Sequence, residues 1–183
     1  MPHPPFMSPA FELLVRYARY HRDQRNVTMH LVGVPLVVFA SAMLLARAPL
    51  HLGGLSTTLA WLAFAALWLW TLSRGQFLLG LATAFFTAAL AWAAHGLAGL
   101  SPLSWLTLAI GLLAVGWLAQ SIGHYYEGRK PGFANDLAGL LVAPMFVALE
   151  LLAMAGLCRP LVARIEQAAG PTTLRDLAQP LAR

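Results

Sequence analysis

Long apolar runs separated by short polar breaks dominate this chain. A run of roughly 20 apolar residues with almost no charge is long enough to cross the hydrocarbon core of a membrane as a helix. Five runs of this kind are predicted to be membrane-spanning helices, at residues 27–47, 55–73, 77–98, 102–124 and 137–157. The runs are continuous and rich in Leu and Ala rather than alternating, which favours a helical bundle over a β-barrel.

Weaker helical patterns lie at both ends of the chain. Residues 11–25 have one apolar face and several arginines elsewhere, which predicts an N-terminal helix at the membrane interface. Residues 159–183 alternate weakly between apolar and polar positions, as an amphipathic tail on the surface would. We therefore expect an all-α integral membrane bundle of about four to five transmembrane helices, with an interfacial helix before it and an amphipathic tail after it. Residues 1–10 are expected to be disordered, and residues 11–158 to form a single membrane-embedded domain.

The composition excludes several classes of protein. Hydrophobic residues make up 59% of the chain and charged residues 10%, whereas a soluble domain carries about a quarter charged residues. The net charge of +5 does not indicate nucleic-acid binding, because the arginines are spread over many segments. A single cysteine, Cys158, excludes both a disulfide framework and a multi-thiolate zinc site. The first 30 residues lack the apolar core of a secretory signal peptide, so the first span is expected to direct insertion.

The distribution of basic residues predicts the orientation of the bundle. With the N-terminus inside, seven arginines and lysines lie in inner segments and five arginines in outer ones, and the inner side is normally the more positive. If the fifth run enters the membrane and returns to the same side instead of crossing it, the tail arginines also lie on the inner side. Either way, the start of the first span and the end of the fourth share the cytoplasmic face. Eleven arginines against one lysine resemble a GC-rich bacterial coding bias, which predicts a bacterial inner membrane.

Two groups of polar residues stand at the ends of apolar runs, where such residues are costly and usually functional. Their members are His21, Asn26 and His30 in the first group and Gln120, His124 and Glu127 in the second. His21 and His30 are nine residues apart and would face opposite sides of one straight helix. A shared site therefore requires a break in the helix, which we place at Asn26, a residue type favoured at the N-cap.

The residue types of the two groups indicate a metal site. Imidazole is the commonest protein metal ligand, and a neighbouring carboxylate can bind the metal or orient a ring. Imidazoles with a carboxylate and open positions suit oxygen-activating non-haem iron, although zinc accepts the same ligands. The alternative leaves the histidines as interfacial side chains and pairs Glu127 with Arg129 or Lys130 in a solvated loop. Glu150, about 20 Å into the fifth run, is expected to have a structural or channel role away from His124.

Three sequence strings carry a resemblance to a known family. The first, H-x4-N-x3-H-x2-G-x-P, comprises His21, Asn26, His30, Gly33 and Pro35. The second, Q-x-x-G-H-x-x-E-x-[RK]-x-P, comprises Gln120, Gly123, His124, Glu127, Arg129 and Pro131. The third, A-P-x-F-V, begins at Ala143 and is followed by Glu150. From Tyr17 to Leu152 the chain resembles the membrane family of 2-hydroxy fatty acid dioxygenases named for the metabolism of phytosphingosine to odd-numbered fatty acids.

The resemblance implies an Fe(II)-dependent dioxygenase of fatty-acid α-oxidation, which uses O2 to shorten a 2-hydroxy fatty acid by one carbon. It implies that His21, His30 and His124 hold the iron. Glu127 would be a fourth ligand or would orient a histidine, and Asn26 and Gln120 would orient a ligand or bind the substrate.

Basic residues near the interface are expected to attract the substrate carboxylate, namely Arg25, Arg129 and Lys130. Two other classes of function compete with the dioxygenase. One is a membrane zinc hydrolase acting on lipids, and the other is a non-catalytic helical membrane protein.

Overall fold

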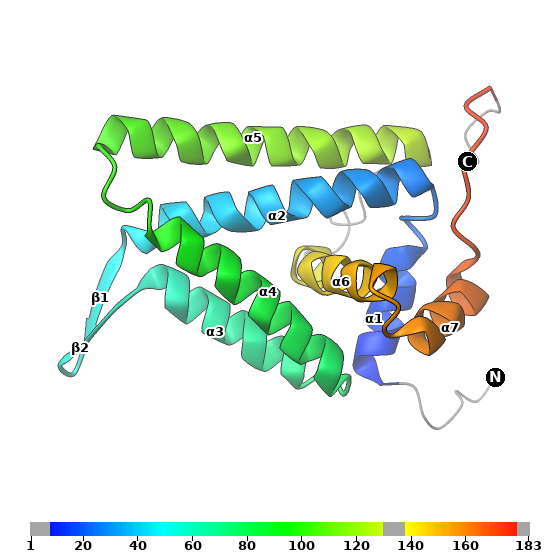
Figure 1. Cartoon of the computed structure of the whole chain (residues 1–183), viewed down its shortest axis with the longest axis horizontal. Helices are drawn as coiled ribbons and strands as arrows, with labels where there is room; N and C mark the ends of the chain where they lie inside the picture. Colours follow the sequence, from blue (N-terminus) through cyan, green and yellow to red (C-terminus); the bar gives the residue numbers. More distant parts are fainter. Residues whose placement is uncertain (1–7, 130–137, 179–183) are drawn as a thin grey trace.

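The structure is a computed structural model that describes residues 8–129 and 138–178. Seven helices are present in these ranges: α1 (Pro9–Ala18), α2 (Gln24–Ala46), α3 (Leu59–Leu72), α4 (Phe77–His95), α5 (Pro102–Glu127), α6 (Ala138–Met154) and α7 (Arg159–Ala169). Two short strands, β1 (Pro49–Leu52) and β2 (Leu55–Thr58), form an antiparallel hairpin between α2 and α3. The predicted all-α class is therefore confirmed, with this hairpin as an addition (Figure 1).

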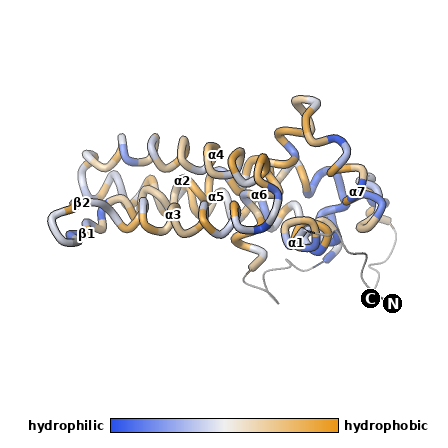
Figure 2. Tube along the Cα trace, turned by 90° about the horizontal axis from the view of Figure 1, so that it is seen from below, coloured by the Kyte–Doolittle hydropathy of each residue, from blue (hydrophilic) through white to orange (hydrophobic). Residues whose placement is uncertain are grey.

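Three of the helices are long and apolar enough to cross a membrane, namely α2, α4 and α5. The other two apolar runs form shorter helices, α3 with 14 residues and α6 with 17. Hydrophobic residues follow the length of the bundle, and hydrophilic ones gather near α1 and α7 (Figure 2). Each of the five apolar runs thus contains a helix, but the helix lengths differ and residues 55–58 of the second run form β2.

The long axis of the bundle is set by α2 and α5, which lie side by side, while α3 and α4 form a second pair (Figure 1). One end, here called the hairpin end, contains β1 and β2. There the hydroxyl of Thr58 lies 3.0 Å from Nε2 of His95, and the guanidinium of Arg47 donates to the carbonyl of Ala98. The opposite end, here called the histidine end, contains the start of α2, the end of α5, and α1. His95 therefore lies at the opposite end of the bundle from the buried histidines.

Glycines bring α2 and α5 into backbone contact. A Cβ added to Gly33 would lie 2.7 Å from the carbonyl oxygen of Gly116, and one added to Gly116 would lie 2.8 Å from Cγ2 of Val37. A Cβ on Gly123 would collide with the side-chain oxygen of Asn26. Small residues of this kind allow two membrane helices to approach closely. This glycine seam fixes the position of the end of α5 against the start of α2.

The break between the first two helices lies earlier than predicted. The first helix ends at Ala18 rather than near residue 25, and the next begins at Gln24. Asp23, not Asn26, is the N-cap of α2, and its carboxylate accepts the backbone N–H of Arg25 at 2.9 Å. Both residue types favour N-caps, so the sequence alone did not distinguish them. The expectation of a break between the two histidines is confirmed, and its placement at Asn26 was wrong.

The C-terminal tail is helical only in its first part. The helix α7 ends at Ala169, and Ile165 is buried against α1 and α6. The apolar positions expected to continue the amphipathic face are exposed, Leu174 by 66% and Leu177 by 46%. The expectation of disorder for residues 1–10 falls mainly outside the described ranges; within them, Pro9 and Ala10 open α1.

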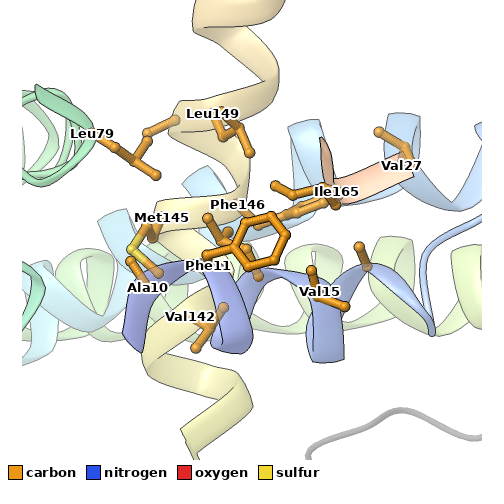
Figure 3. Packing of buried hydrophobic residues seen from close by; sticks show 13 residues of the cluster. Ala10, Phe11, Val15, Val27, Leu79, Val142, Met145, Phe146, Leu149 and Ile165 are labelled. Carbon is orange, nitrogen blue, oxygen red and sulfur yellow. The ribbon is translucent and has the colours of Figure 1, made fainter. Parts of the chain in front are cut away.

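The main apolar core lies at the histidine end, where α1, α6 and α7 pack together. Phe11 and Val15 of α1 face Val142 and Phe146 of α6, with Ile165 of α7 beside them (Figure 3). The helix α6 runs across α1 rather than along it. Each large apolar side chain buried in this way contributes about 1.5–3 kcal/mol. This core supports the segment that follows α1, and that segment carries the first of the polar groups.

Candidate metal centre

Three histidines from three segments meet in the interior of the histidine end. His21 lies in the loop after α1, His30 in α2, and His124 in the last turns of α5. Their exposed fractions are 2%, 2% and 6%, and one ring nitrogen of each lies within 4.8 Å of the others. The predicted meeting of these residues is confirmed. The alternative in which they are solvated interfacial side chains does not fit this burial.

Backbone carbonyls determine the protonation of two of the rings. Nδ1 of His21 lies 2.7 Å from the carbonyl oxygen of Tyr17, and Nδ1 of His30 lies 3.0 Å from that of Asn26. A carbonyl oxygen can only accept, so each Nδ1 must carry the proton and donate it. Both Nε2 atoms are then left with a bare lone pair. Burial and the neighbouring His30 lower the pKa of His21 well below 6.5, which keeps this ring neutral.

The two unprotonated nitrogens face each other. Nε2 of His21 lies 3.2 Å from Nε2 of His30, and with both protons on Nδ1 neither nitrogen can donate to the other. Two nitrogens bound to one metal at about 2.1 Å are separated by roughly 3.0–3.4 Å, depending on the bond angle. The observed spacing therefore suits a shared cation. Nδ1 of His124 is buried and has no hydrogen-bond partner in the described part of the chain. A buried nitrogen without a protein partner is expected where a metal ion or another ligand binds.

These residues fit a divalent transition metal. Three neutral imidazoles, with at least two lone pairs turned inward, form a donor set that Fe(II) and Zn(II) both accept. The carbonyl partners of Nδ1 orient the His21 and His30 rings, as outer hydrogen bonds usually do at metal sites.

Glu127 is a neighbour of the three-histidine group rather than a member of it. Its carboxylate is buried and accepts the backbone N–H groups of Arg22 at 2.9 Å and Asp23 at 2.8 Å. The side-chain amide of Asn26 donates to the same oxygen at 3.1 Å. Glu127 thereby ties the loop that carries His21 to the end of α5. This burial differs from the alternative of a solvated pair with Arg129 or Lys130.

The two amide side chains lie beside the site in different surroundings. Asn26 is fully buried and also donates to the carbonyl oxygen of Tyr20 at 2.9 Å, while its own oxygen has no partner in the described residues. Gln120 is buried one turn before His124, and its amide donates weakly to the carbonyl oxygen of Gly116 at 3.4 Å.

The basic residues proposed for the substrate differ in their availability. Arg25 forms an ion pair with Asp23 at 2.7 Å and lies over the ring of Tyr126 at 4.6 Å. Arg25 and the other hydrogen bonds to Asp23 lower the pKa of that carboxyl to about 2. Arg129 donates to the carbonyl oxygen of Arg19 at 2.9 Å. Lys130 lies outside the described residues.

Two aromatic rings cover the site on its apolar side. The ring of Tyr17 stacks on that of His21 with centroids 4.0 Å apart, and Phe146 of α6 lies 5.6 Å from the same ring. Sequence reasoning assigned no role to Tyr17, although its position four residues before His21 places it on the same helical face. It also missed Asp23, whose signal was its place before an apolar run.

Glu150 belongs to α6 and interacts electrostatically with Arg22, the residue after His21. It is not a member of the three-histidine group. Its structural or channel role stays a prediction.

The geometry defines a helical protein with membrane-length spans and a buried three-histidine centre at one end of the bundle. The chain belongs to the family described as 2-hydroxy-palmitic acid dioxygenase Mpo1-like, whose model matches residues 7–155. It is 28% identical over 152 residues to the 2-hydroxy-palmitic acid dioxygenase MPO1 of Saccharomyces cerevisiae, a match that covers 82% of this chain and 83% of the yeast protein. No solved structure matches the chain. The family resemblance given by the three strings is confirmed.

Proposed function

We propose that this protein is an Fe(II)-dependent dioxygenase of fatty-acid α-oxidation, which cleaves a 2-hydroxy fatty acid with O2 to a fatty acid one carbon shorter. The observation that carries the proposal is the pair of unprotonated Nε2 atoms of His21 and His30, 3.2 Å apart beside His124. Membership of the Mpo1-like family supports the substrate class and the use of oxygen.

The reaction balances without a further reductant. A 2-hydroxy acid, R–CH(OH)–COOH, and one O2 give R–COOH, CO2 and water. The bond between the carboxyl carbon and carbon 2 breaks, and carbon 2 becomes the new carboxyl carbon. Carbon 2 loses three electrons and the former carboxyl carbon loses one, and these four electrons reduce one O2. The hydroxyl and carboxylate of the substrate are the groups that distinguish it from an ordinary fatty acid.

In this proposal His21, His30 and His124 hold the iron. When bound, Fe(II) supplies open positions for a chelating hydroxy acid and for O2. The carbonyls of Tyr17 and Asn26 keep two imidazoles in the ligating tautomer. The rings of Tyr17 and Phe146 exclude water from one side of the centre.

The polar neighbours are assigned supporting roles. Asn26 and Gln120 orient a ligand or bind the substrate hydroxyl or carboxylate, and Glu127 acts as the anchor of the His21 loop rather than through direct ligation. Arg25, Arg129 and Lys130 attract the carboxylate to this end of the bundle. The acyl chain gains about 0.8 kcal/mol for each methylene removed from water. We place the protein in a bacterial inner membrane with the histidine end at the cytoplasmic face.

The first test is metal analysis of the detergent-purified protein. We expect about one iron per chain in the wild type, and loss of iron in His21→Ala, His30→Ala and His124→Ala. His95→Ala is the matched control, because His95 is a half-buried helical histidine at the hairpin end and should leave the iron content unchanged. Iron retained in all three variants contradicts the three-histidine centre.

The second test follows the reaction. Oxygen uptake with 2-hydroxypalmitic acid should yield a fifteen-carbon acid, with palmitic acid itself as the inactive control substrate. Zinc in place of iron together with ester hydrolysis favours the lipid hydrolase. Absence of any bound metal favours a non-catalytic membrane protein.

A further inference from the structure

The C-terminal segment returns to the metal centre after α7. Residues 170–175, here called the strap, follow the helix with Gly170 at a φ of +94°, a left-handed conformation that favours glycine. Thr173 pairs with the loop after α1: its N–H donates to the carbonyl oxygen of Arg22 at 2.8 Å, and its carbonyl accepts the N–H of Gln24 at 2.9 Å. The guanidinium of Arg22 donates to the carbonyl oxygen of Gly170 at 2.6 Å. The strap thus lies along the segment immediately after His21.

Arg175 connects the strap to the two chain segments that carry His21 and His124. Its backbone N–H donates to the carboxylate of Asp23 at 2.9 Å, and its backbone carbonyl accepts from Arg25 at 2.8 Å. Its guanidinium donates to the carbonyl oxygen of Tyr126 at 2.7 Å. One residue therefore holds the N-cap of α2 and the C-terminal turn of α5 at the same time.

The contact of the Arg175 guanidinium with the carbonyl oxygen of Tyr126 stabilises the end of α5. The last carbonyls of a helix lack partners within the helix, and a cation near them is favoured by the helix dipole. The buried carboxylate of Asp23 also needs donors, and the strap supplies one in addition to those of Arg25.

The contacts are close to the ligands along the chain. Asp23 lies two residues after His21, and Tyr126 lies two residues after His124. The strap touches no ring of the centre in any contact described above, so its effect must pass through the backbone. It also lies beyond residue 155, the last residue that the family model matches.

We propose that the strap is a positioning element for the metal centre and that Arg175 is its principal positioning residue. By clamping the N-cap of α2 to the end of α5, Arg175 holds His21 and His124 at the spacing that one metal ion requires. The inference rests on the proposed function only in requiring that the three histidines bind a metal. It does not depend on which reaction the metal supports.

The test uses Co(II) as a spectroscopic probe on full-length, metal-free protein in detergent. Wild type, Arg175→Ala, Arg175→Lys and Arg159→Ala are titrated with Co(II), and the visible absorption band gives both the Kd and the geometry of the ligands. Arg159→Ala is the matched control, since it removes an exposed arginine from the same tail. Circular dichroism and thermal unfolding of the metal-free proteins report whether each variant is folded.

We expect Arg175→Ala to weaken Co(II) binding about 10-fold and to alter the absorption band. Losing a residue that hydrogen-bonds a metal ligand directly weakens binding by about 10- to 100-fold, and Arg175 acts one step further out. Arg175→Lys keeps a cation beside the end of α5 and should bind more tightly than the alanine variant but less tightly than the wild type. Arg159→Ala should bind as the wild type does.

A wild-type Kd and spectrum in Arg175→Ala overturns the inference, as does a lower melting temperature with unchanged Co(II) binding. Equal weakening in Arg159→Ala overturns it as well, because loss of charge would then be sufficient. If Arg175→Ala does not fold, the lysine variant decides, and a wild-type Kd there has the same meaning. Failure of the wild type to bind Co(II) overturns the metal centre itself. Co(II) binding without oxygen uptake by the iron form overturns only the proposed reaction.

Discussion

The carbonyl oxygens of Tyr17 and Asn26 decide what His21 and His30 can do. Each accepts a hydrogen bond from Nδ1–H, so the proton stays on Nδ1 and Nε2 is left as an acceptor with no donor opposite it. His95 shows the contrasting case, because its Nδ1 donates to its own helix while its Nε2 lies 3.0 Å from the Thr58 hydroxyl, which can donate to it. The two kinds of histidine look alike in the sequence. They differ in whether Nε2 has a protein donor.

Glu127 allows a prediction about stability at the same scale. A glutamine can keep its oxygen at the position that accepts from Arg22, Asp23 and Asn26, but its NH2 group then replaces the second oxygen, which accepts from the N–H of Arg22. The resulting clash of buried donors should lower the free energy of unfolding by about 1–3 kcal/mol and weaken metal binding. Chemical denaturation in detergent measures the change.

Glu12→Gln is the control for this change, since it makes the same substitution at an exposed position of α1. A Glu127→Gln variant as stable as Glu12→Gln would show that the carboxylate does not hold the loop.

The three histidines of the candidate centre could be recognised from the sequence, and the groups that anchor them could not. His21, His30 and His124 stand out because imidazoles are expensive at the ends of apolar runs. The partners of Glu127 are mainly backbone N–H groups, which every residue has and no sequence pattern marks. Arg175 resembled any other arginine of a polar tail, because its role depends on where the strap returns.

The contact between α2 and α5 supports a prediction at the scale of elements. Gly116 and Gly111 both lie inside α5, but a Cβ on Gly116 would meet Val37 and the carbonyl of Gly33 below 3.0 Å, whereas one on Gly111 would meet nothing within 4 Å. Gly116→Ala should therefore force the helices apart and destabilise the protein by about 1–3 kcal/mol. Metal affinity should fall with it, because His30 and His124 lie on these two helices.

Gly111→Ala makes the same chemical change without a clash and should raise helix stability by up to about 1 kcal/mol. Thermal unfolding and Co(II) titration of both variants test the pair. Equal behaviour of the two would mean that the glycine seam does not set the spacing of the helices.

The existence of the helices was predictable, and their ends were less so. Apolar runs specify where a helix can lie in a membrane. The expected second span included β2, the second strand of the hairpin, although Gly53 and Gly54, with φ of +54° and +90°, are the pair typical of a tight hairpin turn. The sequence offered both Asp23 and Asn26 as the N-cap of α2, and only the folded loop shows that Asp23 takes this position.

For the molecule as a whole, the packing of α7 on α1 changes the count of charges. From the sequence, the arginines of the C-terminal tail were assigned to the outer side of the membrane, on the assumption that the fifth apolar run crosses it. Arg164 instead lies over the ring of Phe11, and Arg175 binds at Asp23, so both belong to the histidine end. At the hairpin end, Arg47 is the arginine that the described residues provide. The orientation with the histidine end inside is therefore better supported than the sequence count indicated.

This orientation can be tested by cysteine labelling in oriented membrane vesicles. In a Cys158→Ser background, Ser56→Cys reports the hairpin end and Ala178→Cys the histidine end, and both positions are exposed. An impermeant maleimide should label residue 178 only from the cytoplasmic side and residue 56 only from the opposite side. The reverse pattern would invert the orientation, and labelling of both from one side would mean that the bundle does not cross.

The glycine seam also restricts how a lipid can reach the histidines. With backbones in contact at Gly33, Gly116 and Gly123, no space for an acyl chain remains between α2 and α5. A fatty acid arriving from the bilayer therefore cannot pass between the two helices that carry His30 and His124. Its route has to lie across another side of the three-histidine group. In the proposed reaction, residues outside the contact of α2 with α5 would therefore select the length of the substrate chain.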